Sequence, residues 1–109
     1  MHAISTSLLL STALLCGAGA WAQTTPSAAD LAKASGCYSC HANGEKVVGP
    51  AFASIAEKYA GDKDAAASLA QSIQNGSKGK WGRIPMPGHS SISQDDLKTM
   101  ARHVLSTKP

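Results

Sequence analysis

Two cysteines and a histidine form the most chemically specific group in this sequence. Cys37 and Cys40 stand three positions apart, and His41 follows the second cysteine directly. This C-x-x-C-H pattern is the attachment sequence of c-type haem. Two thiols at this spacing reach the two vinyl groups of one porphyrin, and the histidine is carried beneath the ring toward the iron. The pattern therefore predicts one covalently bound haem c, with His41 as an iron ligand.

The same two cysteines have three other interpretations: a thioredoxin-like dithiol, half of a zinc site, or a structural disulfide in an exported protein. The dithiol normally accompanies a βαβ pattern, which this sequence lacks. A zinc site needs a second pair of ligands, whereas His89 and His103 each stand alone. The histidine that follows the second cysteine favours haem over all three.

A six-coordinate haem needs a second axial ligand. The candidates after the leader are Met86, Met100, His89 and His103. Met86 lies between Pro85 and Pro87, and these prolines stiffen a loop that presents the side chain outside any helix. Met100 has the helical spacing of a core residue. We predict Met86 as the ligand, with His89 as its rival, and a His/Met pair raises the reduction potential and leaves no open position on the iron.

The first 22 residues differ in composition from the rest of the chain. They contain no Asp, Glu, Lys or Arg, carry an apolar run over residues 8–15, and end in Ala20-Trp21-Ala22. This layout predicts a secretory signal peptide over residues 1–22. The apolar run is too short to span a bilayer. Cleavage after Ala22 would remove Cys16 and leave residues 23–109 as one exported domain.

The charged residues limit the kinds of partner. All ten Lys and Arg residues and all seven Asp and Glu residues lie in residues 23–109, giving a net charge of +3. This excess is too small for a nucleic-acid-binding surface, but it permits docking on the acidic surface of another protein. The basic residues near the cysteines and Met86 have two interpretations: they steer such partners toward the haem, or they only keep the surface solvated. They are Lys33, Lys46, Lys78, Lys80 and Arg83.

The remaining pattern predicts an all-α fold of about four helices, because no segment alternates apolar and polar residues as a sheet strand does. The expected helices cover residues 27–35, 50–60 and 65–75, with a fourth beginning at Ser93. Ser27 and Ser93 are each followed three positions later by Asp, as in a capping box, and Pro50 is expected in a first helical turn. A core mainly of small aliphatic residues would be marginal at this length, and a haem would supply the missing apolar volume.

Four segments resemble the short class I cytochromes c of bacterial periplasms. They are residues 36–42 (GCYSCHA), 48–51 (VGPA), 75–87 (NGSKGKWGRIPMP) and 104–106 (VLS). The resemblance implies a periplasmic, soluble, monomeric one-electron carrier that is not an enzyme, takes no small-molecule substrate, and serves redox proteins such as nitrite reductases and terminal oxidases. It also implies that the Pro50 carbonyl accepts the His41 N–H and that Trp81 donates its indole N–H to a haem propionate.

Three features, which involve four residues, depart from that resemblance. Ser72 stands where some relatives place Arg near a propionate, and Ala32 and His103 occupy a helix crossing where relatives often place aromatic residues. His89 is either an exposed loop residue or a contact of Met86 that makes the potential depend on pH near neutrality. Two other functions stay open: a haem sensor or peroxidase-like enzyme, if Met86 leaves the iron, and a thiol-disulfide oxidoreductase, if the cysteines are free.

Overall fold

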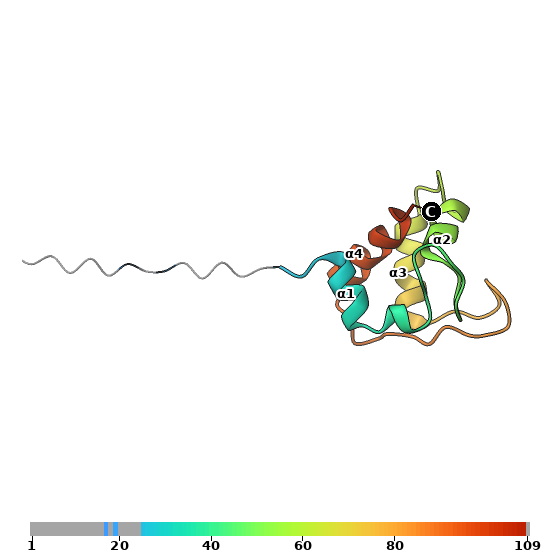
Figure 1. Ribbon diagram of the computed structural model, residues 1–109, viewed down its shortest axis with the longest axis horizontal. Helices are drawn as coiled ribbons and strands as arrows, with labels where there is room; N and C mark the ends of the chain where they lie inside the picture. Colours follow the sequence, from blue (N-terminus) through green and yellow to red (C-terminus); the bar gives the residue numbers. More distant parts are fainter. Residues whose placement is uncertain (1–16, 18, 20–24, 109) are drawn as a thin grey trace, which may run out of the picture.

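The computed structural model describes residues 17, 19 and 25–108 (Figure 1). Of the predicted signal peptide only Gly17 and Gly19 are described, and Cys16 lies outside the described residues. In chain order the elements are α1 (Ala28–Ala34), the 3-10 helix η1 (Cys37–Ser39), α2 (Phe52–Lys58), α3 (Ala65–Asn75) and α4 (Gln94–Leu105). The described residues thus form four α-helices as predicted, joined by long loops that make two isolated β-bridges. None of these helices is long and apolar enough to cross a membrane.

Serine caps begin the first and last helices. The Ser27 hydroxyl accepts the Asp30 N–H at 3.1 Å, and the Asp30 carboxylate accepts the Ser27 N–H at 3.2 Å, which completes the predicted capping box. Hydrogen bonds from the Ser27 side chain and backbone hold the pKa of the Asp30 carboxyl below its usual value. At α4 the Ser93 hydroxyl accepts the Asp96 N–H at 3.2 Å, which is the serine half of the second predicted box.

The second helix begins later than the sequence predicted. Ala51 is the N-cap of α2 with an extended backbone conformation, so Pro50 precedes the helix instead of occupying its first turn. The first turn belongs to Phe52, whose N–H donates to the Ala42 carbonyl at 2.9 Å. This outcome leaves the Pro50 carbonyl outside the helical hydrogen-bond ladder, where it is available to a side chain.

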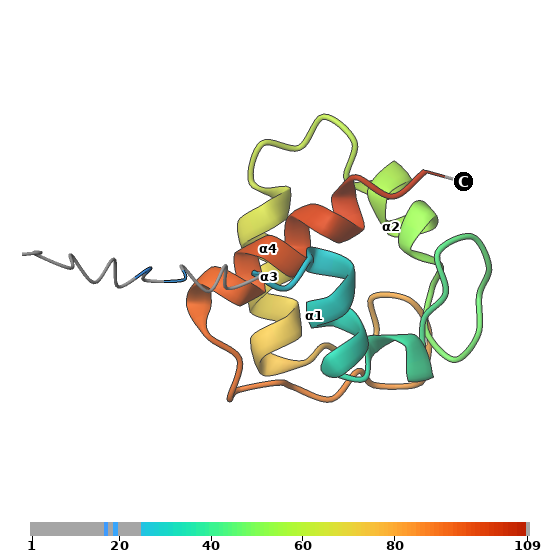
Figure 2. The ribbon, with the colours of Figure 1, turned by 60° about the vertical axis from the view of Figure 1, so that its left-hand side comes forward.

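The core lies where α4 crosses the other helices. Figure 2 shows α4 in front of α3 and next to α1, and α4 contacts α1, α2 and α3. Leu97 and Met100 of α4 are fully buried, which confirms Met100 as a core residue. The buried cluster comprises Ala32, Phe52, Ile55, Leu69, Ala70, Ile73, Leu97, Met100, Ala101 and Val104. Three members are alanines, and the other seven are larger apolar residues that supply most of the buried apolar area.

His103 of α4 makes a polar contact with Tyr38 and packs against Phe52. Its Nε2 lies 3.3 Å from the Tyr38 hydroxyl, and its ring meets Phe52 edge-on at a centroid distance of 6.3 Å. Ala32 is buried beneath α4. The C-terminal helix is therefore tied to the turn that carries the two cysteines, through Tyr38.

Candidate functional site

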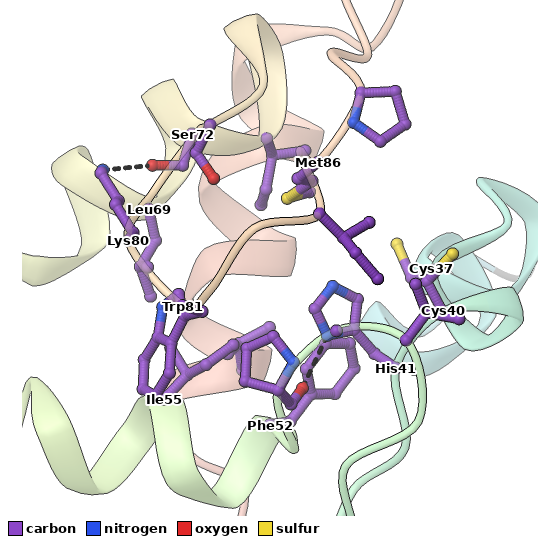
Figure 3. A pocket seen from close by; sticks show the side chains of 18 of the residues that line it. Cys37, Cys40, His41, Phe52, Ile55, Leu69, Ser72, Lys80, Trp81 and Met86 are labelled. Carbon is purple, nitrogen blue, oxygen red and sulfur yellow. Dashed lines mark hydrogen bonds between the residues drawn. The ribbon is translucent and has the colours of Figure 1, made fainter.

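One large pocket opens between the helices and the loops that carry the sequence motifs (Figure 3). It contains about 1030 Å³ of space, part of it open to solvent. Its floor is apolar and comes from the core, including Phe52, Ile55 and Leu69. All the residues predicted to bind the cofactor line this pocket: Cys37, Cys40, His41, Pro50, Trp81 and Met86. The fold therefore brings together side chains that lie up to 49 positions apart in the sequence.

The Pro50 carbonyl determines which nitrogen of His41 can bind a metal. His41 Nδ1 lies 2.7 Å from the Pro50 oxygen (Figure 3). A carbonyl oxygen can only accept a hydrogen bond, so Nδ1 carries the ring proton and Nε2 keeps its lone pair. This is the usual way in which proteins orient a metal-binding imidazole. The contact implied for Pro50 by the sequence resemblance is present.

Two further residues fix the plane of the His41 ring, and the sequence interpretation missed both. Phe52 stacks on the imidazole with a centroid distance of 5.0 Å and an interplanar angle of 26°. Gly49 lies so close that a Cβ there would stand 2.5 Å from His41 Cε1, far inside van der Waals contact. The available signal was the position of the only Phe of the chain two residues after the Val-Gly-Pro segment.

The C-x-x-C-H segment forms a tight helical turn. The His41 N–H donates to the Cys37 carbonyl at 2.9 Å, and the Cys40 carbonyl accepts the N–H groups of Val48 at 3.1 Å and Gly49 at 2.7 Å. Figure 3 shows both sulfur atoms at the same end of the pocket. This arrangement suits attachment of two neighbouring substituents on one planar group.

The chemistry of this turn disfavours the other interpretations of the cysteines. Burial raises the pKa of the Cys37 thiol, whereas a redox-active dithiol needs a lowered pKa. Cys37 and Cys40 form no disulfide with each other. Among the described residues, no three His, Cys, Asp or Glu side chains gather as a zinc site requires.

Met86 is held at the pocket by its backbone. Its N–H donates to the Ser77 carbonyl at 2.9 Å, and its carbonyl accepts the Ser77 N–H at 3.1 Å. Gly76 has a φ of +79°, and a Cβ there would stand 2.5 Å from the Met86 oxygen, so this close pairing of loop segments requires glycine. Figure 3 shows the Met86 side chain entering the pocket from a different element than His41.

The other ligand candidates are placed less favourably. Met100 also reaches the pocket wall, but it is only 2% exposed and belongs to the core of α4. His103 contacts Tyr38 and Phe52. His89 is half-buried and its N–H donates to the Ile73 carbonyl at 2.8 Å, but neither histidine is among the residues that line the pocket. The suggested effect of His89 on the potential stays a hypothesis.

The donor set and the pocket fit a c-type haem. The site offers an imidazole nitrogen, a thioether sulfur and two thiols around an apolar space, and these are the groups that hold a haem in a His/Met site. The sequence comparisons decide the family. A family model described as cytochrome c matches residues 27–108. This chain belongs to the cytochrome c family.

Similar proteins extend over most of this cytochrome c. It is 49% identical over 100 residues to cytochrome c-551 of Pseudomonas aeruginosa, covering 92% of each chain. It is 50% identical over 80 residues to cytochrome c-552 of Nitrosomonas europaea, covering 73% of this chain and 78% of the relative.

Solved structures confirm the fold class. The crystal structure of wild-type cytochrome c552 from Nitrosomonas europaea superposes with a TM-score of 0.71 at 50% identity, covering 73% of this chain and 99% of that one. The class 1 cytochrome MtoD from Sideroxydans lithotrophicus ES-1 superposes with a TM-score of 0.64 at 26% identity, covering 75% of this chain and 94% of the other. Membership in the family confirms three predictions: the all-α cytochrome c fold, one covalent c-type haem, and one-electron transfer.

Proposed function

We propose that this cytochrome c attaches its haem through Cys37 and Cys40 and binds the iron with His41 Nε2 and the Met86 sulfur. The hydrogen bond from His41 Nδ1 to the Pro50 carbonyl carries this proposal, because it leaves Nε2 as the free lone pair in the pocket. When bound, the haem supplies one-electron chemistry by alternating between ferric and ferrous iron. The chain supplies the ligands, their orientation and an apolar surrounding.

The same residues keep the ligand set constant. Stacking by Phe52 and the Pro50 hydrogen bond hold His41, and the two backbone hydrogen bonds with Ser77 hold Met86. With both axial positions filled, no substrate reaches the iron, so we assign no enzymatic activity. A sensor or peroxidase-like function would require Met86 to leave, and the backbone pairing with Ser77 opposes that movement.

Trp81 is proposed to donate its indole N–H to a haem propionate. The indole is half-buried at the pocket wall, and a buried indole N–H needs an acceptor. The Lys58 ammonium lies 4.5 Å from the centre of the indole ring, a cation–π contact that helps to hold the ring in place.

We further propose that residues 1–22 are a signal peptide and that residues 23–109 act as a monomeric carrier in the periplasm. The composition of the leader supports export. The similarity to the Pseudomonas aeruginosa protein extends into this segment, because an alignment of 100 residues must include part of it when only 87 residues follow Ala22.

The rim of the pocket is proposed as the docking surface for redox proteins with acidic surfaces. Val48 and Ile84 line the pocket and are 44% and 67% exposed, and exposed apolar residues at a site edge are typical of an interaction surface. Lys46, also exposed, forms a β-bridge with His41. These residues place a positive charge beside an apolar contact area.

Replacing Lys46 with glutamine is expected to slow oxidation of the reduced holoprotein by ferricyanide about twofold at low salt, because the anion loses electrostatic attraction near the haem. The difference should disappear as salt screens the charge. Stopped-flow kinetics would measure it, with Lys98→Gln on the exposed side of α4 as the matched control. Equal salt dependence for the two variants would argue against docking at this rim.

Spectroscopy of the purified holoprotein tests the proposed ligands. We expect six-coordinate low-spin iron with the weak sulfur-to-iron absorption band of the oxidised form, a polypeptide mass increased by one haem, and a raised potential by potentiometry. A five-coordinate spectrum, or bis-histidine ligation without the sulfur band, would show that Met86 is not the ligand.

A further inference from the structure

Lys80 is a charged residue in an otherwise uncharged pocket wall. Among the described residues that line the pocket, it is the only Lys, Arg, Asp or Glu. Its ammonium donates to the Ser72 hydroxyl at 2.9 Å, which joins the 76–91 loop to α3 (Figure 3). A lysine on an exposed loop would otherwise extend into water to keep its rotamer freedom. The contact therefore positions a cation at the pocket.

The position of Lys80 corresponds to one end of the pocket. Figure 3 shows Lys80, Ser72 and Trp81 on the side away from the sulfur atoms of Cys37 and Cys40. A haem carries its two vinyl groups, which the cysteines attack, on one edge, and its two propionate carboxylates on the opposite edge. If the cysteines hold the vinyl edge, as proposed above, the carboxylate edge points toward Lys80 and Trp81.

A carboxylate at this wall would meet Lys80, the charged side chain among the described lining residues. Lys80 is exposed, and a nearby cation stabilises the charged form of a carboxylate. The Ser72 hydroxyl of α3 holds the Lys80 ammonium at this wall.

We propose that Lys80, held by Ser72, is the cationic partner of one haem propionate. This inference rests on the haem orientation proposed above. The pair of charges also acts on the iron, because an uncompensated carboxylate favours the ferric form and a neighbouring ammonium opposes that effect. Lys80 thereby raises the reduction potential.

Other ionisable groups near this wall are arranged differently. Lys58 of α2 faces the Trp81 ring at 4.5 Å, and the other ionisable residues that line the pocket with Lys80 are Tyr59, His41, Cys37 and Cys40, none of which is a carboxylate. Lys78 and Arg83 are exposed on the same loop but do not line the pocket. Lys80 is thus the cation with a direct hydrogen bond to the pocket wall, and Lys78 is a matched control.

Potentiometric titration of the Lys80→Met holoprotein between about pH 5 and pH 8 tests the proposal. Without Lys80 the pKa of the propionate rises into this range, so the potential falls as the group ionises with increasing pH. At pH 8 the ferric-to-ferrous ratio at a fixed potential should rise about threefold. This corresponds to a midpoint potential roughly 30 mV below that of wild type, at 59 mV per tenfold change. The difference from wild type should shrink toward pH 5, where the propionate of the variant is protonated.

Two comparisons separate this role from a general surface charge. Lys78→Met should give only a small shift that is the same at every pH, and the double variant Lys80→Met with Ser72→Arg should restore the wild-type curve by returning a cation from α3. Identical curves for Lys80→Met and Lys78→Met, or no restoration by Ser72→Arg, would overturn the proposal. Haem stain and the low-spin spectrum report separately on the proposed attachment and ligands, and all variants should keep both.

Discussion

Replacing Met86 with alanine is expected to lower the midpoint potential by on the order of 0.2 V, a sizeable part of the ~0.8 V over which axial ligands tune haem proteins. The thioether stabilises ferrous iron and its loss removes that preference. The variant should also bind carbon monoxide readily, since one position on the iron becomes accessible. Potentiometry and carbon monoxide difference spectra of the purified holoprotein would measure both effects.

Met100→Leu is the matched control, because Met100 is the other methionine that reaches the pocket. Leucine conserves its volume, so the stability cost should stay below about 1.5 kcal/mol, and the potential should remain close to that of wild type. Loss of the sulfur-to-iron band in Met100→Leu, with the band retained in Met86→Ala, would reverse the ligand assignment. A potential unchanged in Met86→Ala would also contradict it.

Replacing both Cys37 and Cys40 with alanine is expected to abolish covalent haem attachment completely. The haem-stained band on a denaturing gel should disappear, and the polypeptide mass should fall by one haem after correction for the substitutions. Stability should fall as well, because the apolar pocket of about 1030 Å³ loses its tethered occupant, and core residues such as Phe52, Ile55 and Leu69 form its wall. Native stabilities of small domains are only about 5–15 kcal/mol, so we expect no cooperative thermal transition at room temperature or above.

Ser39→Ala is the control for this experiment. Ser39 lies within the same turn, is exposed, and keeps the spacing of the two cysteines. It should retain full haem stain and the wild-type melting transition by circular dichroism. Covalent haem in the double cysteine variant would show that attachment uses another group and would refute the assignment of Cys37 and Cys40.

Several features of the site were predictable because they depend on residues close together in the chain. The covalent spacing of Cys37, Cys40 and His41 encodes the attachment chemistry within one turn. The Ser27 to Asp30 pattern predicted the capping box that begins α1. The sequence distinguished the two methionines, because Met100 has the helical spacing of a core residue and Met86 lies in a loop between two prolines. The burial of Met100 agrees with that distinction.

The start of α2 shows where local rules were insufficient. Proline is tolerated in a first helical turn, so Pro50 was expected inside the helix. In the structure the Phe52 and Ala53 N–H groups donate instead to the carbonyls of Ala42 and Asn43, both at 2.9 Å. Those carbonyls follow the cysteine turn, and this tertiary contact decides where the helix begins.

The sequence alone predicted the chemistry of this protein: one covalent haem, which membership in the cytochrome c family confirms, and the proposed attachment and His/Met ligands. Only the tertiary structure decided the stacking of Phe52 on His41, the pairing of Ser77 with Met86, and the contact of Lys80 with Ser72. The physical reason is the distance along the chain between the residues that interact. Bond lengths and helical periodicity encode what neighbours in the chain can do, whereas contacts between separate elements arise when all of them pack around the same pocket.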